Sequence, residues 1–310
     1  MRKVALSLAI IALALPFLTA VPAQAQASRT WVSGTGDDAN ANSPTFCSRT
    51  LPCKTFGAAI SATTAGGEIN CVDPGSFGPV NITKAISISC EAGTAGILGD
   101  GITINAATTD VVTLRGLDIE GQGGSFAGIV IVSAKAVYIE KCAIRNFLAF
   151  PSGAAIQIDN LVFTVFLFVT DTVISDNSNG IRLFNSGGFK VASLKNVVIT
   201  GSSSNGLVLG SANVYANVTK SIISGNGGSA VNAAASSTTV NIDRSTIANN
   251  AVALNAAASG STIRVSGNNI YNNTTGFVIA AGATIQTDNS NNTGGSNGGA
   301  TIPNGSLAKN

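Results

Sequence analysis

The stretch Ile174-Ser-Asp-Asn177-Ser-Asn-Gly180-Ile181 decides the fold, because copies of it return along most of the chain. The clearest second copy is Ile270-Tyr-Asn-Asn273-Thr-Thr-Gly276-Phe277. The leading isoleucine recurs at intervals of 25, 30, 25, 24, 24 and 23 residues, as Ile119, Ile144, Ile174, Ile199, Ile223, Ile247 and Ile270. A repeat of this length is typical of a solenoid, in which each turn buries its apolar face against its neighbours.

Aliphatic residues precede every isoleucine at two fixed distances. Five positions before it stand Leu114, Ile139, Val169, Leu194, Val218, Ile242 and Val265. Seven positions before it stand Val112, Val137, Leu167, Ala192, Ala216, Val240 and Ile263. Apolar residues two positions apart predict a short strand with one face inward. Polar pairs such as Lys195-Asn196 follow that strand and predict a corner before the isoleucine.

A second corner follows the isoleucine. Asparagine stands three positions after it four times, at Asn177, Asn226, Asn250 and Asn273. Asparagine tolerates turn conformations, and its amide can bond to the copies above and below. We therefore predict a ladder of stacked asparagines inside this corner.

These repeats resemble the right-handed parallel β-helix of the pectin-lyase-like superfamily. The segments Cys53–Ile60 and Gly66–Gly75 look like the capping helix and first strand with which such proteins begin. The resemblance implies an all-β fold, a right-handed parallel β-helix solenoid of about nine to ten rungs with a short N-terminal capping helix. It implies no particular activity, because one fold hosts many functions.

The N-terminus resembles a signal peptide. Arg2 and Lys3 precede an apolar run from Val4 to Leu18, and small residues permit cleavage after Ala25 or Ala27. We expect a secreted or periplasmic protein with no membrane insertion after cleavage. The predicted organisation is residues 1–27 signal peptide, 28–52 N-terminal extended segment, 53–288 parallel β-helix and 289–310 flexible C-terminal tail.

Charge excludes some classes of partner. The 310 residues include 17 Lys and Arg against 15 Asp and Glu, so cleavage of Arg2 and Lys3 leaves 15 of each. A neutral chain lacks the basic surface that nucleic acid or an anionic membrane requires. We expect no nucleic-acid partner and no cofactor. The remaining candidate partners are an extracellular polysaccharide or a cell-envelope component.

Five cysteines in an exported chain allow two disulfides. Cys47 and Cys53 flank a turn-rich loop and are one candidate pair. Cys71 and Cys90 each follow an isoleucine by two residues, which would place them on adjacent rungs and makes them the other pair. Cys142 falls in an inward column, so we expect a buried free thiol.

The absence of histidine restricts the chemistry. It excludes Ser-His-Asp and Cys-His catalysis and most zinc sites. The resemblance leaves a pectate-lyase scheme, in which aspartates hold calcium and an arginine or lysine removes a proton. Its candidates here would be Asp159, Asp171 and Asp176, with Arg145 or Arg182 as the base.

Opposite charges on adjacent rungs argue against that scheme. The repeat aligns Arg115 with Glu140, Lys141 with Asp171, and Glu120 with Arg145. Such cross-strand pairs stabilise a sheet by roughly 0.2 to 1 kcal/mol and cancel a concentrated negative field. We therefore predict no catalytic residue and no metal site.

Aromatic residues gather in the one interval that runs to 30 residues. Five of the 13 phenylalanines lie there, at Phe147, Phe150, Phe163, Phe166 and Phe168. Alternation turns Phe166 and Phe168 outward, and Tyr138 matches Phe168 on the rung before. Such rings could bind a sugar or a partner. Alternatively, the inserted loop at 147–153 folds back and covers them.

The predicted ligand-binding residues are Tyr138, Phe166, Phe168, Phe147, Phe150, Arg145 and Asp171. The favoured function is a non-catalytic module that binds polysaccharide or an envelope partner, with stacked side chains such as Thr200, Ser224, Asn217 and Asn241 as hydrogen-bonding groups. The alternative is a divergent polysaccharide lyase or glycosidase acting on an acidic polysaccharide. A purely structural role as a spacer is a third hypothesis.

Overall fold

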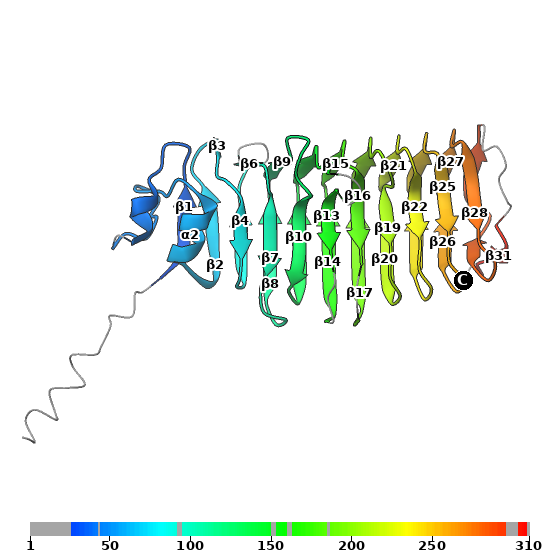
Figure 1. Cartoon of the computed structure of the whole chain (residues 1–310), viewed down its shortest axis with the longest axis horizontal. Helices are drawn as coiled ribbons and strands as arrows, with labels where there is room; N and C mark the ends of the chain where they lie inside the picture. Colours follow the sequence, from blue (N-terminus) through cyan, green and yellow to red (C-terminus); the bar gives the residue numbers. More distant parts are fainter. Residues whose placement is uncertain are drawn as a thin grey trace, which may run out of the picture.

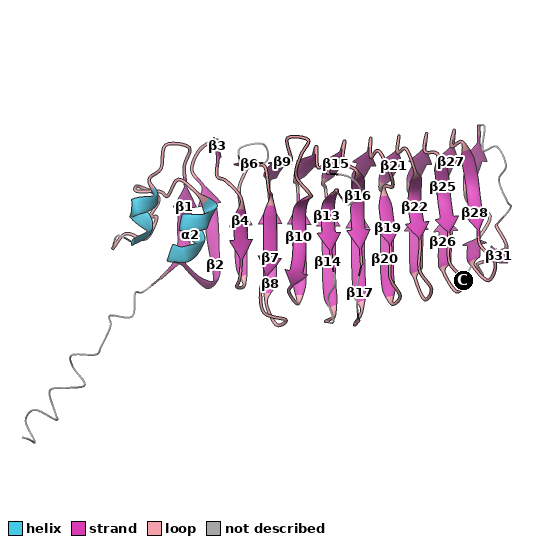
Figure 2. Cartoon of the chain, in the orientation of Figure 1, coloured by secondary structure: helices cyan, strands magenta, loops and turns pink. Residues whose placement is uncertain are grey.

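The protein winds into turns that stack in a straight row, with three strands in most turns (Figure 1). The computed structural model describes residues 26–42, 44–91, 95–149, 153–159, 163–184, 187–295 and 303–308. Almost all regular structure is strand, and helix is drawn only at the N-terminal end (Figure 2). The strands form three sheets, here called A, B and C, and every pairing between neighbouring strands is parallel. The predicted all-β solenoid is confirmed.

Sheet A has 12 strands and holds the residues before each first corner. It contains β1 (Ala27–Val32), β2 (Thr63–Cys71), β5 (Ile86–Ser89), β8 (Val111–Arg115), β11 (Ala136–Glu140), β14 (Val165–Thr170), β17 (Lys190–Lys195), β20 (Val214–Thr219), β23 (Thr239–Asp243), β26 (Thr262–Ser266), β29 (Thr284–Thr287) and β31 (Gly305–Ser306).

Sheet B has 10 strands and follows sheet A in each turn. It contains β3 (Gly75–Ser76), β6 (Ala95–Leu98), β9 (Leu117–Glu120), β12 (Ala143–Arg145), β15 (Val173–Ser175), β18 (Val198–Thr200), β21 (Ile222–Ser224), β24 (Thr246–Ala248), β27 (Asn269–Tyr271) and β30 (Asn292–Gly294).

Sheet C has nine strands and completes the turn. It contains β4 (Val80–Ile82), β7 (Ile102–Asn105), β10 (Ala127–Ser133), β13 (Ala154–Ile158), β16 (Asn179–Leu183), β19 (Leu207–Leu209), β22 (Ser229–Ala233), β25 (Val252–Ala256) and β28 (Thr275–Ile279).

The isoleucine repeat is the centre of sheet B. Ile144 pairs with Ile119 on one side and Ile174 on the other, and the same register continues to Ile270. All seven isoleucines are buried. Burial of such a side chain contributes about 1.5 to 3 kcal/mol, so the column supplies a large part of the core.

A short helix closes the N-terminal end of the core. Helix α2 (Phe56–Ala62) begins after Thr55, whose hydroxyl accepts a hydrogen bond from the Ala58 N–H at 3.1 Å. Phe56 is buried, and its ring lies 5.1 Å from the ring of Phe77. The helix packs on β1, β2 and β4, and on the 3-10 helix η1 (Asp38–Asn42). The predicted capping helix is therefore confirmed.

Strands extend beyond the predicted solenoid boundaries at both ends. β1 lies in the segment predicted as an N-terminal extension, and it pairs with β2. β30 and β31 lie after residue 288, where a flexible tail was predicted, and pair with β27 and β29. The predicted signal peptide lies outside the described residues except for Gln26 and Ala27. No helix within the described residues is long and apolar enough to cross a membrane.

The cysteines pair as predicted. Cys47 is bonded to Cys53, and Cys71 is bonded to Cys90. Cys142 is a buried free thiol. Burial raises the pKa of Cys142 to about 11, which keeps the thiol neutral at physiological pH.

The predicted asparagine ladder occupies the corner between sheets B and C. The side-chain oxygen of Asn250 accepts hydrogen bonds from the backbone N–H of Asn226, at 3.1 Å, and from its side-chain amide, at 2.8 Å. Asn273 accepts the same two bonds from Asn250. The Asn250 amide also donates to the carbonyls of Ile223 and Ala248. The ladder therefore satisfies buried backbone groups where the chain leaves the sheet.

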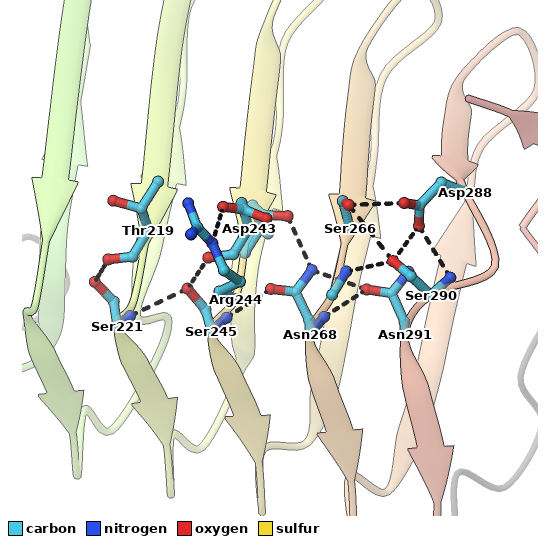
Figure 3. Close-up of polar contacts among 12 residues, drawn as sticks. Thr219, Ser221, Asp243, Arg244, Ser245, Ser266, Asn268, Asp288, Ser290 and Asn291 are labelled. Atoms are coloured by element: carbon cyan, nitrogen blue, oxygen red, sulfur yellow. Dashed lines mark hydrogen bonds and ion pairs between the residues drawn. The ribbon is translucent and has the colours of Figure 1, made fainter. Parts of the chain in front are cut away.

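A second polar ladder, not predicted, occupies the corner between sheets A and B (Figure 3). The Ser221 N–H donates to the Ser245 hydroxyl at 3.1 Å, and the Ser245 N–H donates to the Asn268 side-chain oxygen at 2.8 Å. The Asn268 N–H donates in turn to Asn291 at 2.9 Å. The residue type in this column changes from serine to asparagine between Ser245 and Asn268, which explains why no single-residue repeat revealed it.

Candidate functional site

The outer face of sheet A presents the aromatic side chains. Alternation within β11 and β14 directs Leu167 and Val169 inward and leaves Phe166 and Phe168 outside. Tyr138 pairs with Phe168 across the two strands. The two rings are stacked, with centroids 4.6 Å apart and planes 9° from parallel. The predicted pairing of these rings is therefore confirmed.

Two further aromatic side chains extend the group toward the C-terminus. Tyr215 shares a register row with Val191 and Phe166 on three successive strands. The ring of Phe189, in the corner before β17, lies 6.1 Å from the Tyr215 ring. Tyr215 was missed although it stands eight residues before Ile223, the spacing that separates Phe166 from its own isoleucine. We call Tyr138, Phe166, Phe168, Phe189 and Tyr215 the aromatic platform.

The platform is accessible to solvent. Phe166 is 37% exposed, Tyr215 37% and Phe189 49%. The described part of the inserted loop lies at the B–C corner, where the Phe147 carbonyl accepts a bond from the Ser178 N–H at 2.9 Å. The described residues of this loop therefore lie away from sheet A and do not cover the platform.

A buried lysine lies behind the platform. Lys190 is fully buried, and its ammonium donates hydrogen bonds to the carbonyls of Phe163 and Gly187. Burial lowers the pKa of Lys190. These bonds tie together the two segments that precede β14 and β17 and hold the backbone next to Phe189.

Polar side chains continue the same outer face beyond the aromatic residues. The column of Tyr138 and Phe168 runs on through Ser193, Asn217, Asn241, Arg264 and Gln286. The Asn241 amide donates to the Asn217 oxygen at 2.8 Å, and the Arg264 Nε donates to Gln286 at 2.8 Å. Thr200 and Ser224, predicted to act with these amides, pair with one another on sheet B instead. Sheet A therefore combines flat rings with a row of amides.

Phe147, a predicted ligand-binding residue, is not on the aromatic platform. Its side chain is fully buried at the position that asparagine occupies in the next turn. Gly121 and Gly128 make room for the ring, because a Cβ atom on either residue would lie within 3 Å of it. Those glycines are 26 and 19 residues away, so the cavity could not be inferred from local alternation. Phe150 lies outside the described residues.

Arg145 lies on sheet B, away from the platform. Its guanidinium forms ion pairs with Asp118 and with Glu120, the latter at 2.7 Å. The hydrogen bonds that the Arg145 guanidinium donates to Asp118 are the main cause that raises the pKa of Arg145. A guanidinium held this way cannot serve as a proton acceptor. The predicted role of Arg145 in ligand binding finds no support in its position.

Of the other two predicted charge pairs, one forms an ion pair and the other does not, within the described residues. Arg115 and Glu140 form an ion pair at 2.9 Å. Lys141 and Asp171 lie in the same shallow groove of about 320 Å³, but no ion pair joins them in the described part of the chain. Asp171 instead accepts a hydrogen bond from Asn196 at 2.7 Å. Asp171 thus lies on the A–B corner and not beside the aromatic rings.

The aspartates of the pectate-lyase scheme are not brought together. Asp159 follows β13 on sheet C, Asp171 lies at the A–B corner, and Asp176 follows β15 at the B–C corner. Arg182 hydrogen-bonds to Gln157 and lies 4.5 Å from the Phe184 ring centroid. Desolvation lowers the pKa of Arg182. Within the described residues, no group of three or more Cys, Asp or Glu side chains is placed to hold a metal ion.

Comparison with known proteins agrees with this architecture. A family model described as right handed beta helix region matches residues 163–309. The crystal structure of pectate lyase Pel9A superposes with a TM-score of 0.66 at 14% identity, over 92% of this chain and 79% of that chain. At this identity the likeness concerns the fold alone.

Two other solved structures are less similar. The Dettilon tailspike protein gp208 gives a TM-score of 0.46 at 13% identity, over 85% of this chain and 67% of that chain. The A-module of the Azotobacter vinelandii mannuronan C-5 epimerase AlgE6 gives 0.34 at 17% identity, over 81% and 92%. No curated protein sequence matches this chain.

Proposed function

We propose that this right-handed parallel β-helix is an exported, non-catalytic module that binds a polysaccharide on the outer face of sheet A. The observation that supports this most is the aromatic platform. The C–H face of a sugar ring packs well on a flat aromatic ring, and the amide column beyond the platform can bond to sugar hydroxyls.

The aromatic side chains of the platform are exposed to solvent, whereas the other sheet faces carry few aromatic rings. Large apolar patches on a protein surface mark sites of interaction. The backbone beneath this one is rigid, because β14 and β17 are paired on both sides and Lys190 joins the segments that precede them. A ligand therefore meets rings that are already in place, which reduces the entropy cost of binding.

Several observations weigh against a lyase or glycosidase. The Arg145 guanidinium is held by Asp118 and Glu120, and Asp159, Asp171 and Asp176 lie on three different parts of the turn. General acid–base catalysis requires such groups around one substrate position. Export is supported by the N-terminal sequence and by the two disulfides, which form in oxidising compartments.

The test measures retention and turnover on the same panel of acidic and neutral polysaccharides, with calcium present. We expect retention of the protein in affinity electrophoresis without new reducing ends or unsaturated products. Replacing Phe168 or Tyr138 by alanine should weaken binding by about tenfold or more, equivalent to ~1.4 kcal/mol. The matched control is Phe126→Ala, because Phe126 is 68% exposed but lies outside the platform.

Two results would reject the proposal. Product formation that is lost on changing Asp171 or Arg145 would establish the enzymatic alternative. Absence of retention by every polysaccharide, combined with capture of an envelope protein that depends on Phe168, would reassign the platform to a protein partner.

A further inference from the structure

The outer face of sheet B carries a row of aliphatic side chains that are exposed or partly exposed. Each strand of this sheet turns its central isoleucine inward, so the residues on either side of it face outward. The first outward position is occupied in successive turns by Asp118, Ala143, Val173, Val198, Ile222, Thr246 and Asn269. Val173 is 46% exposed and Ile222 is 42% exposed.

This row is nearly the same when read in either direction. Three branched aliphatic residues stand in the middle, a small or hydroxyl residue flanks them on each side, and a polar residue ends the row at both extremes. The centre is Val198. A surface that matches its own reverse is what a two-fold symmetric contact between identical chains requires.

Charged residues on the adjoining A–B corner show a related pattern. Asp171, Asn196 and Lys220 occupy the corner in three successive turns, and all three are exposed. The acid therefore stands one turn before the neutral centre and the base one turn after it. Reversing the column places each acid opposite a base.

We propose that the outer face of sheet B binds a second copy of this chain, with the two solenoids antiparallel and the two-fold axis along β18. Val198 then meets its own copy, and Val173 packs on the partner's Ile222. Asp171 faces the partner's Lys220, and the symmetry repeats this contact on the other side of the axis.

One like-charge contact accompanies these pairs. Lys141 and Arg244 lie two turns from the axis on opposite sides, so Lys141 faces the partner's Arg244. Each has an acid of its own chain nearby, since the Arg244 Nε lies 2.6 Å from Asp243 and Lys141 shares its groove with Asp171. At exposed positions such a contact is largely screened by physiological salt.

The size of the face sets the expected strength. Seven strands, three residues wide, give a face of about 29 Å by 10 Å. The corner residues widen this area, but it stays below the ~800 Å² per partner of a standard stable interface. We therefore expect a dimer that forms at tens to hundreds of micromolar. The contact is independent of polysaccharide binding, because the aromatic platform lies on sheet A.

Sedimentation equilibrium of the mature protein from about 5 to 500 μM tests the proposal. The wild type should approach the dimer mass, and Val198→Asp should remain monomeric. Val278→Asp is the control, because Val278 is a surface valine on sheet C, 38% exposed, and lies away from the proposed contact. Thermal unfolding of each variant verifies that the fold is intact. A monomeric wild type throughout the range, or equal effects of the two substitutions, would overturn the proposal.

Charge reversal tests the register. Asp171→Lys and Lys220→Asp should each weaken the dimer about tenfold or more, because each creates two like-charge contacts. The double variant should recover most of the wild-type association. Recovery in the double variant cannot come from a change in folding of one chain alone. If the double variant is as weak as the single variants, the antiparallel register is wrong.

Cross-linking locates the axis. Face-to-face sheets pack about 10 Å apart, so Thr200→Cys, on the axis, should cross-link to its copy with a short bis-maleimide. Tyr271→Cys shares the same outward column but lies three turns away, which puts the two copies about 29 Å apart. The buried Cys142 thiol does not compete for the reagent. Equal cross-linking of both variants would overturn the proposal.

Discussion

At the scale of single residues, a buried and an exposed asparagine make the same kind of amide hydrogen bond. We expect the buried one to contribute more to the free energy of unfolding. Asn250 is 2% exposed and makes hydrogen bonds to both neighbouring turns, whereas Asn241 is exposed and bonds to Asn217 and Arg264 on the surface. Water can replace the lost partners at Asn241 but not at Asn250.

We therefore expect Asn250→Ala to reduce the free energy of unfolding by about 2 to 4 kcal/mol, because it removes the acceptor of the buried Asn226 N–H and of the Asn226 side-chain amide. Asn241→Ala, the matched control, should cost less than about 1 kcal/mol. Urea unfolding followed by circular dichroism measures both. Equal losses for the two variants would show that the buried ladder has no special energetic role.

A second residue-scale prediction concerns Asp73 in the N-terminal cap. Its carboxylate accepts hydrogen bonds from the Ser33 hydroxyl at 2.7 Å and from the Gly34 N–H at 2.6 Å. The bond from Ser33, followed by that from Gly34, lowers the pKa of Asp73 below 3.8. Because the folded pKa is lower than the unfolded one, the contribution to stability is complete above the unfolded pKa and disappears as the pH falls through the folded pKa.

Asp73→Asn should accordingly lower the unfolding temperature at pH 7, and the difference from the wild type should shrink as the medium is acidified below pH 3.8. Thermal unfolding of both proteins across this range checks the sign. A difference that stays constant with pH would assign the effect to geometry and not to charge.

At the scale of elements, β1 bears on the choice between the two predicted cleavage sites. Ala27 pairs with Thr63 in the first strand pair, and the Gln26 side chain donates a hydrogen bond to the Ser61 carbonyl at 2.6 Å. Cleavage after Ala25 keeps both contacts, and cleavage after Ala27 removes both. We therefore expect a mature chain that begins at Gln26. The intact mass of the exported protein distinguishes this from a chain that begins at Ser28.

Most strands of the solenoid could be predicted from the sequence, and two at the C-terminal end could not. The isoleucine column, the two aliphatic columns of sheet A and the asparagine ladder follow from spacing alone, because parallel pairing places equivalent residues of successive turns side by side. β30 and β31 were missed, since a composition rich in Asn, Gly and Ser resembles a linker even where it pairs with an existing sheet.

The candidate site was predictable only in part. Alternation correctly turned Phe166 and Phe168 outward. It could not place Phe147, because the space that receives the ring is made by Gly121 and Gly128 on other turns. The same limit explains Arg145, which could be aligned with Glu120 in sequence. Its second partner, Asp118, occupies a different register position, opposite Ala143.

At the scale of the whole molecule, stability should be nearly additive over turns, because each turn contacts mainly its two neighbours. Deletion of residues 198–221 removes one full repeat of 24 residues and brings Val197 onto Ile222. The inward columns and both polar ladders keep their register, since Ser245 replaces Ser221 as the acceptor for the Val197 N–H.

This shortened chain should fold, with a far-UV circular dichroism spectrum like that of the wild type and a lower unfolding temperature. Deletion of residues 210–221 alone is the matched control, because it removes half as many residues and shifts every later column out of register. We expect that variant to be unfolded or aggregated. Failure of both deletions would mean that the turns do not behave as exchangeable units.

The helix α2 gives the molecule two unlike ends. It covers the core beside β1 and β2, whereas β28, the last described strand of sheet C, has no described partner on its outer side. Head-to-tail stacking of solenoids, the route to an endless fibre, would require an open edge at both ends. With the N-terminal end covered, one chain cannot stack head-to-tail on the next, so this route to a filament is closed. A single short helix is enough to block it.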